Sequence, residues 1–169
     1  MRCRIRKMTA MDIDGTVRAL REAKIDIFNR FERGHYPKRA HLFDLSRISR
    51  ENYQRALDSK DKESYYFVAE MNGRIVGAAY GRIFGKSGFS FLHSVAVHPS
   101  KQRQGVGEKL LREVVAYSRK QGCHKISLNT LQVLIPALKL YLKLGFVPEA
   151  YLRKQWWKVD FIQMSKWLN

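Results

Sequence analysis

The stretch from Gln102 to Gly107 has the residue types of an anion-binding turn. An apolar segment ends at Val97, a basic turn with glycines at 105 and 107 follows, and a strongly amphipathic segment begins inside it. The first N–H groups of a helix lack partners within the helix, and the helix dipole places partial positive charge there. Glycines would let a phosphate approach the backbone, and Arg103 can add charge-assisted hydrogen bonds. The turn therefore predicts a site for a phosphate-bearing ligand.

Two better-known phosphate loops do not fit this stretch. No Gly-Lys-Ser/Thr follows the glycines, so the turn is not a Walker loop. The third glycine of the dinucleotide fingerprint is also missing. A plain glycine turn before a helix is the alternative without a ligand.

Hydrophobic periodicity and turn residues predict a mixed α/β order around this turn. The strand–helix–strand unit that contains it should place its two strands parallel to each other. Strands are predicted near Ile5 and at 65–70, 75–83, 89–97, 125–129, 146–150 and 159–167, and helices at 11–30, 49–59, 106–121 and 136–144.

Size and charge limit the class of protein. The 169 residues fit one domain, residues 1–169, and no apolar run is long enough to cross a bilayer. The net charge of +17, from 32 Lys and Arg against 15 Asp and Glu, favours an anionic partner. The basic residues are dispersed, so nucleic acid is an unlikely partner. Cys3 and Cys123 lack metal-ligand spacing, which predicts reduced thiols in a cytoplasmic protein and no metal. We expect a monomer or a homodimer.

The turn and its surroundings resemble the GNAT superfamily of acetyl-CoA-dependent N-acetyltransferases. The superfamily signature, Gln/Arg-x-x-Gly-x-Gly/Ala, is matched by residues 102–107. The strand end Val95–Pro99 precedes it, and the segment Ala137–Phe146 follows at the distance typical of the family. The resemblance extends over about 67–146 and does not specify a substrate.

The resemblance implies a mixed α/β, GNAT-like fold: a central, mostly antiparallel twisted sheet with a splayed parallel strand pair and helices on both faces. It also implies acetyl-CoA as the cosubstrate. Its pantetheine arm would pair with one strand, and its pyrophosphate would bind amides at the turn. The residues concerned are Val95, Ala96 and Val97 on the strand, and Gln102, Arg103, Gln104, Gly105, Val106, Gly107 and Glu108 at the turn.

Acetyl transfer to an amine requires a neutral amine and a leaving thiolate that can be protonated. A lysine amine is almost wholly protonated at pH 7, whereas about one α-amine in ten is neutral. By resemblance, Tyr141 stands near the sulfur as the general acid. A packing tyrosine is the alternative.

The general base is less clear from the sequence. Some relatives use a carboxylate where this chain has Asn129, which cannot accept a proton. His93 is the alternative, and in a regular strand it would share a face with Val95 and Val97. A bulge would change that face. Glu70 is a further alternative.

The acceptor is expected to contact His35 and Tyr36, in the loop that often lines the acceptor site in relatives, and Asn129. Trp156 and Trp157 are expected to pack rather than to recognise the acceptor. The predicted function is direct acetyl transfer to a protein N-terminus, a lysine or a small amine, and the charge favours an anionic acceptor or acidic peptide. A non-catalytic acyl-CoA-binding or sensing module is the alternative, because Asn129 and Leu134 replace polar residues that the family uses.

Overall fold

The computed structural model describes residues 3–59 and 61–168 and contains one seven-stranded sheet in the order β1-β2-β3-β4-β5-β7-β6. Neighbouring strands are antiparallel except for β4 and β5, which are parallel as predicted. The strands are β1 (Cys3–Lys7), β2 (Ser64–Met71), β3 (Arg74–Phe84), β4 (Phe89–Val97), β5 (Lys125–Thr130), β6 (Val147–Trp156) and β7 (Val159–Trp167). The helices are α1 (Ile13–Ile27), α2 (Lys38–Arg47), α3 (Arg50–Asp58), α4 (Val106–Lys120) and α5 (Ile135–Lys143).

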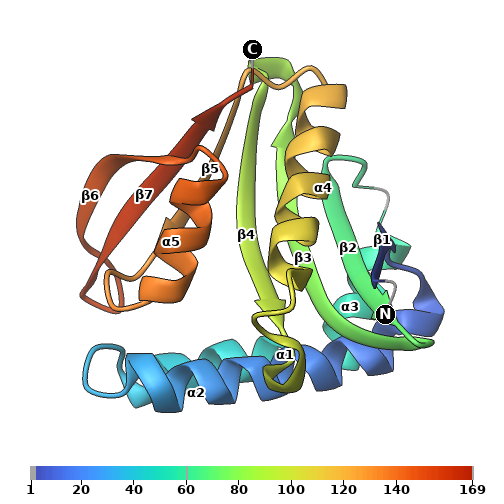
Figure 1. Cartoon of the computed structure of the whole chain (residues 1–169), viewed down its shortest axis with the longest axis horizontal. Coiled ribbons are helices and arrows are strands. Elements are labelled where there is room, and N and C mark those ends of the chain that lie inside the picture. Colours follow the sequence, from blue (N-terminus) through green and yellow to red (C-terminus); the bar gives the residue numbers. More distant parts are fainter. Residues whose placement is uncertain (1–2, 60, 169) are drawn as a thin grey trace.

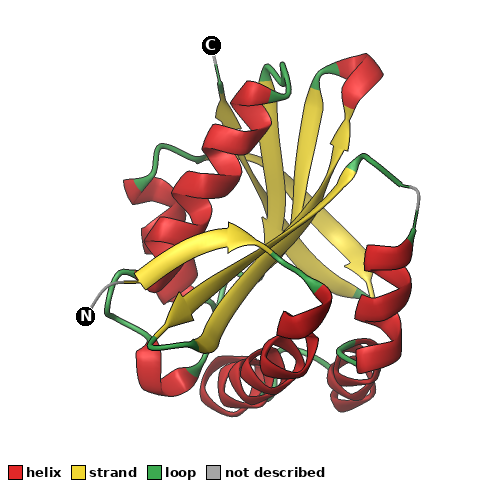
Figure 2. Cartoon of the chain, turned by 90° about the vertical axis from the view of Figure 1, so that its right-hand side faces the viewer, coloured by secondary structure: helices red, strands yellow, loops and turns green. Residues whose placement is uncertain are grey.

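Helices cover both faces of the sheet, as the resemblance implied (Figures 1 and 2). The larger core lies between the sheet and helices α4 and α5, and the fully buried Leu110, Leu111 and Phe146 belong to it. A second core joins α1 and α3 to the opposite face through Ile13 and Tyr53. Figure 1 shows α1 and α2 running beneath the end of the sheet to which β4 points.

The hairpin between β2 and β3 turns at Asn72 and Gly73, which have φ values of 51° and 71°. Positive φ at both central positions is what an Asn-Gly hairpin turn requires. The antiparallel meander from β2 to β4 therefore follows from the turn chemistry.

Apart from shifts of one or two residues at element ends, the structure differs from the prediction in three places. The helix predicted over 11–30 is divided into the 3-10 turn η1 (Ala10–Asp12), α1 and the π-helical turn η2 (Phe28–Glu32). The strand predicted over 146–150 continues to Trp156. Helix α2 was not predicted, because its apolar residues form no single stripe: Leu42 and Phe43 are exposed. Within the described residues, no helix is long and apolar enough to span a bilayer.

Candidate active site

The sheet opens between β4 and β5. These strands pair only from Phe89 with Lys125 to Leu92 with Leu128. Beyond that point β4 continues beside β3 and β5 continues beside β7, so the two strands diverge (Figure 1). Residues 95–97 are half-buried, and β5 does not pair with their free edge. The sheet is thus splayed at the parallel pair.

The turn before α4 presents an open helix start beside this gap. Gly105 is the N-cap with a φ of 79°, and no side chain caps the helix. A Cβ at Gly105 would meet no heavy atom within 4 Å, whereas one at Gly107 would lie 3.4 Å from Leu140 and 3.7 Å from Val97. Gly105 therefore supplies a backbone conformation that favours glycine, whereas a Cβ at Gly107 would make only ordinary van der Waals contacts.

The two glutamine side chains of the turn form hydrogen bonds to backbone carbonyls and so stabilise its conformation. Gln102 donates from Nε2 to the carbonyl of Val97 at 3.1 Å, and Gln104 donates to the carbonyl of Ser100 at 3.1 Å. The Oε1 of Gln102 also accepts a hydrogen bond from Arg30 in η2 at 3.3 Å. The side chain of Arg103 is exposed, and the backbone of this residue has a φ of 57°. Of these side chains, Arg103 is the one available to a ligand.

Glu108 lies in the first turn of α4, where a carboxylate would repel an anion. Its oxygens bind Arg112 at 2.7 Å and Lys143 of α5 at 2.6 Å. Hydrogen bonds from Lys143, and then from Arg112, lower the pKa of Glu108. The carboxylate is therefore charged but compensated, and it ties α4 to α5.

Tyr141 lies on the α5 side of the sheet. The residue is 8% exposed, and its ring centroid lies 6.0 Å from that of Phe146. Burial raises the pKa of Tyr141 to about 12. No described residue accepts a hydrogen bond from the Tyr141 hydroxyl. Its oxygen is nevertheless absent from the described polar atoms that are fully buried without a partner, which are Thr16 Oγ1 and His41 Nδ1. Its hydroxyl oxygen therefore retains a small contact with solvent.

His93 does not share a face with Val95 and Val97, so the expectation for a regular strand was wrong. Tyr80 pairs with Ser94, whereas Gly81 pairs with Leu92, which leaves His93 as the extra residue of a β-bulge. The ring of His93 lies parallel to that of Tyr80, with centroids 6.1 Å apart.

The bulge turns His93 away from the α4 side. Val95 and Val97 pack against the core formed with α4, whereas Tyr80 stacks with Tyr66, which packs against the core of α1 and α3. The side chain of His93 is exposed, but the protein around it removes enough water to lower its pKa. His93 and Tyr141 consequently lie on opposite faces of the opened sheet.

The other base candidates lack a free carboxylate at the gap. Asn129 is half-buried in β5, just beyond the last pair with β4, and its Oδ1 accepts from Gln163 at 3.4 Å. Glu70 lies on β2, two strands away from the opening, and pairs with Arg6 at 2.8 Å. The structure therefore keeps Glu70 out of the site.

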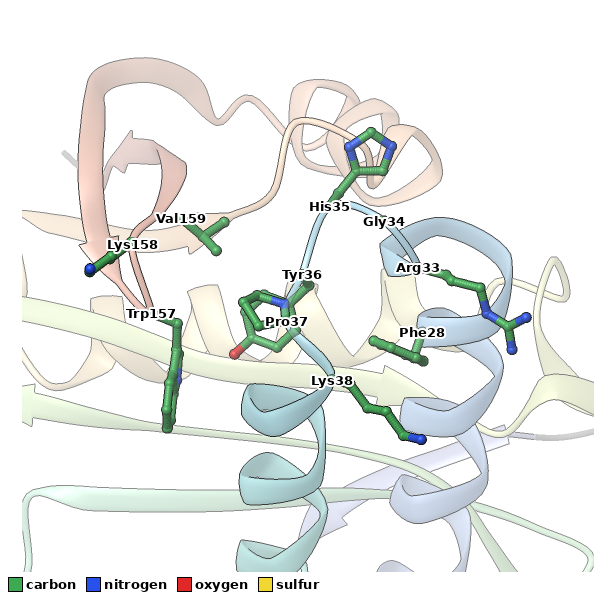
Figure 3. A pocket seen from close by; sticks show the side chains of 10 residues that line it. All are labelled: Phe28, Arg33, Gly34, His35, Tyr36, Pro37, Lys38, Trp157, Lys158 and Val159. Carbon is green, nitrogen blue, oxygen red and sulfur yellow. The ribbon is translucent and has the colours of Figure 1, made fainter.

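A cavity of about 620 Å³ lies between the connection from α1 to α2 and the turn between β6 and β7. His35 and Tyr36 both line it, together with Trp157 (Figure 3). Tyr36 packs in one cluster with Leu131, the residue that follows β5. The cavity therefore adjoins the β5 side of the gap. Trp156 packs on Phe161 outside it.

Sequence reasoning did not assign Trp157, Phe28, Arg33, Lys38 or Lys158 to this cavity. The available signal was the basic and aromatic run 153–158, together with the turn that joins the last two strands. Without α2 in the prediction, nothing indicated what this turn would face.

The acetyltransferase (GNAT) family model matches residues 24–146. The chain belongs to this family. It is 30% identical over 107 residues to the L-methionine sulfoximine/L-methionine sulfone acetyltransferase of Salmonella typhimurium, which covers 58% of this chain and 63% of that protein. An uncharacterized N-acetyltransferase of Schizosaccharomyces pombe is 32% identical over 75 residues, or 44% of this chain and 46% of that protein. The chain thus matches about half to two thirds of these relatives.

Solved GNAT structures share the whole fold. The PaiA N-acetyltransferase of Thermoplasma acidophilum, solved with coenzyme A, has a TM-score of 0.80 at 20% identity, with 99% of both chains covered. The ribosomal-protein-S18-alanine N-acetyltransferase of Escherichia coli has a TM-score of 0.71 at 20% identity, with coverages of 99% and 95%. A putative acetyltransferase of Salmonella typhimurium, solved with acetyl-CoA, also has 0.71, at 21% identity and coverages of 100% and 95%. These likenesses establish the predicted fold.

Proposed function

We propose that this protein is an N-acetyltransferase that moves the acetyl group of acetyl-CoA directly to an amine. The observation that carries the proposal is the opening between β4 and β5 beside the uncapped, glycine-bearing start of α4. Because the chain belongs to the GNAT acetyltransferase family, we interpret this combination as a site for acetyl-CoA. A binding module without activity is the alternative, and no observed feature favours it over the enzyme.

The residues at the opening fit coenzyme A. Open space at Gly105, the exposed Arg103 and the compensated charge of Glu108 suit a pyrophosphate at the start of α4. The free edge of β4 at 95–97 suits the amide groups of a pantetheine arm. When bound, acetyl-CoA supplies a thioester, whose acetyl carbon forms a C–N bond with the amine as the C–S bond breaks.

Tyr141 would act on the leaving sulfur from the α5 side. With a pKa of about 12, its hydroxyl keeps its proton at any physiological pH. A thiol with a pKa of about 8.5 is a stronger acid than this phenol, so complete proton transfer from Tyr141 is unfavourable. We therefore assign Tyr141 a hydrogen bond that stabilises the departing thiolate, and solvent can complete the protonation.

His93 would accept the proton of the amine from the opposite face. A lowered pKa leaves the imidazole neutral at pH 7, which is the form that can accept a proton. No described residue makes a hydrogen bond to its ring nitrogens. A hydrogen-bond donor and a base on opposite faces match an amine that approaches from the α1 side while the sulfur lies toward α5.

The acceptor is an amine, with His35, Tyr36 and Asn129 as its contacts in our proposal. The names of the relatives include an amino-acid derivative and a protein alanine as acceptors, so they support an amine without selecting one. We also propose that the chain forms a single domain, that the protein is a monomer or a homodimer, and that it is located in the cytoplasm. The location is supported by Cys3 and Cys123, which are both free thiols.

An acceptor screen tests the function. The protein is incubated with acetyl-CoA and a panel of peptides with free α-amines, lysine peptides and small amines, while free thiol and the mass of each acceptor are followed. Thiol release matched by a gain of one acetyl group on an amine is the expected result. Tight coenzyme A binding without amine-dependent thiol release would instead identify a binding module.

A further inference from the structure

The cavity of about 620 Å³ that His35 and Tyr36 line, which we call the acceptor cavity, combines an aromatic interior with a cationic rim. Phe28, Tyr36 and Trp157 surround it, and no aspartate or glutamate is among its lining residues. Figure 3 shows the charged ends of Arg33 and Lys158 on opposite sides of these rings. Such a surface attracts an elongated anionic ligand more strongly than a neutral one.

The acidic residues next to the cavity share one lysine. Asp44 of α2 binds Lys24 at 3.0 Å and accepts a hydrogen bond from the Tyr36 hydroxyl at 3.1 Å. Glu32 is 3% exposed and binds the same Lys24 at 3.3 Å. Lys24 balances one of the two carboxylates, so at most one negative charge beside the cavity offsets the cationic rim.

The rim cations have no such compensation. Arg33 donates to the amide oxygen of Asn29 at 2.9 Å, and none of the described acidic residues forms an ion pair with Arg33, Lys38 or Lys158. All three side chains are exposed. Their charges therefore remain available to a ligand that brings carboxylates of its own.

The turn that carries part of this rim is in an unfavourable conformation. Trp157 and Lys158 have φ values of 57° and 60°, and both residues line the cavity. A left-handed conformation is unfavourable for a residue with a Cβ, because the Cβ comes too close to the neighbouring carbonyl oxygen. Asparagine and glycine usually occupy such a two-residue hairpin turn, so the large side chains here are retained against the backbone preference.

We propose that the cavity selects acidic peptides as acceptors, with the peptide body against the aromatic side chains and its carboxylates along the cationic rim. A peptide suits this cavity better than a small acid does, because cations on both sides of the rings require negative charges that are separated in space. This inference rests on the proposed acetyl transfer, and it specifies the acceptor class.

Two peptides of equal length test it. Each carries a free α-amine and one lysine, and they differ only in that one has three Glu or Asp residues where the other has Gln or Asn. We expect kcat/KM to be about tenfold higher for the acidic peptide at low salt, and the ratio to approach one at about 0.5 M salt. A fluorescent form of each peptide, bound to the protein without acetyl-CoA, provides a second readout.

The matched variants remove equal charge at different places. Arg33→Gln, Lys38→Gln and Lys158→Gln together should lower the acidic preference at least about fivefold in both readouts. Lys62→Gln, Arg74→Gln and Lys86→Gln remove three exposed charges outside the cavity lining and should preserve it. Coenzyme A affinity reports whether each variant is folded.

The outcomes separate the two proposals. Acetyl transfer to amines without preference for the acidic peptide would overturn this inference alone, as would an equal loss of preference in both triple variants. Failure to acetylate any amine, with coenzyme A still bound, would overturn the proposed function and this inference with it.

Discussion

Tyr141 is held by packing rather than by hydrogen bonds to its hydroxyl. Its ring is buried beside Phe146, and the hydroxyl keeps a small contact with solvent. A phenol in this setting can offer one hydrogen bond without first breaking another. The same burial that raises its pKa makes it a poor source of a free proton.

Tyr141→Phe keeps the ring and removes only the hydroxyl. We expect kcat to fall about 10- to 100-fold, which corresponds to one hydrogen bond to a charged group, while the Kd for acetyl-CoA stays within a few-fold. Single-turnover rates, where chemistry rather than product release is observed, are the proper measurement. Equal rates in the two proteins would make Tyr141 a packing residue.

His93→Gln tests the base through pH. Because the pKa of His93 is lowered, the imidazole is neutral throughout pH 7–9, and only an α-amine acceptor titrates in that range. The variant should lose about tenfold or more of kcat/KM at pH 7, and the loss should shrink toward pH 9 as more of the amine is already neutral.

Glu70→Gln is the control for that experiment, since Glu70 pairs with Arg6 away from the opening. It should retain turnover at every pH. A loss in His93→Gln that stayed constant from pH 7 to pH 9 would mean that the histidine is structural. The face of His93 could not be predicted, because alternation along a strand does not reveal a bulge.

At the scale of elements, the start of α4 combines the positive φ of Gly105 with a position, Gly107, that has no side chain beside Leu140 and Val97. Gly107→Glu should weaken acetyl-CoA binding more than about tenfold, because it adds a bulky anion where the helix end attracts phosphate. Gly107→Ala is the matched control: its Cβ makes ordinary contacts at 3.4 and 3.7 Å. Calorimetry should separate the two variants, and equal affinity in both would remove the turn from the cofactor site.

The turn between β6 and β7 gives a prediction about stability. Lys158→Gly relieves a positive φ and should raise the free energy of unfolding by about 0.5–1 kcal/mol after the entropy of glycine is subtracted. Lys158→Ala removes the same charge but keeps the strain, so it should change stability little. Denaturant titrations compare them, and a glycine variant no more stable than the alanine one would refute the strain.

The elements that the sequence predicted well are those with a strong local signal. β4 and β7 begin and end where expected, and α4 is one residue shorter than predicted, because alternation, amphipathicity and glycine stops agree there. α2 carries no comparable pattern, since packing onto η2 and the last hairpin, rather than onto the sheet core, determines which residues it buries. The missing helix also hid the acceptor cavity.

For the molecule as a whole, the net charge of +17 indicated an anionic partner, but its distribution required the structure. Carboxylates such as Asp12, Glu70 and Asp44 are engaged in ion pairs. Among the described residues, no carboxylate forms an ion pair with Arg33, Lys38 or Lys158 at the rim of the cavity. The turn that we propose for the cofactor could be singled out from the sequence because six consecutive residues form it. The cavity that we propose for the acceptor brings together segments more than a hundred residues apart, and their proximity depends on tertiary packing.

The hydrogen bond from Arg30 to Gln102 joins η2, beside the proposed acceptor cavity, to the turn proposed for the cofactor. Phe28 of the same short η2 segment lines the cavity, and a contact of 2.6 Å between His98 and Glu22 connects α1 to the residues that precede the turn. Two ligands whose affinities both depend on the position of one shared segment are coupled. By thermodynamic reciprocity, each ligand then changes the affinity of the other by the same factor. The Kd of acetyl-CoA measured with and without the acceptor should therefore shift as much as the Kd of the acceptor measured with and without acetyl-CoA.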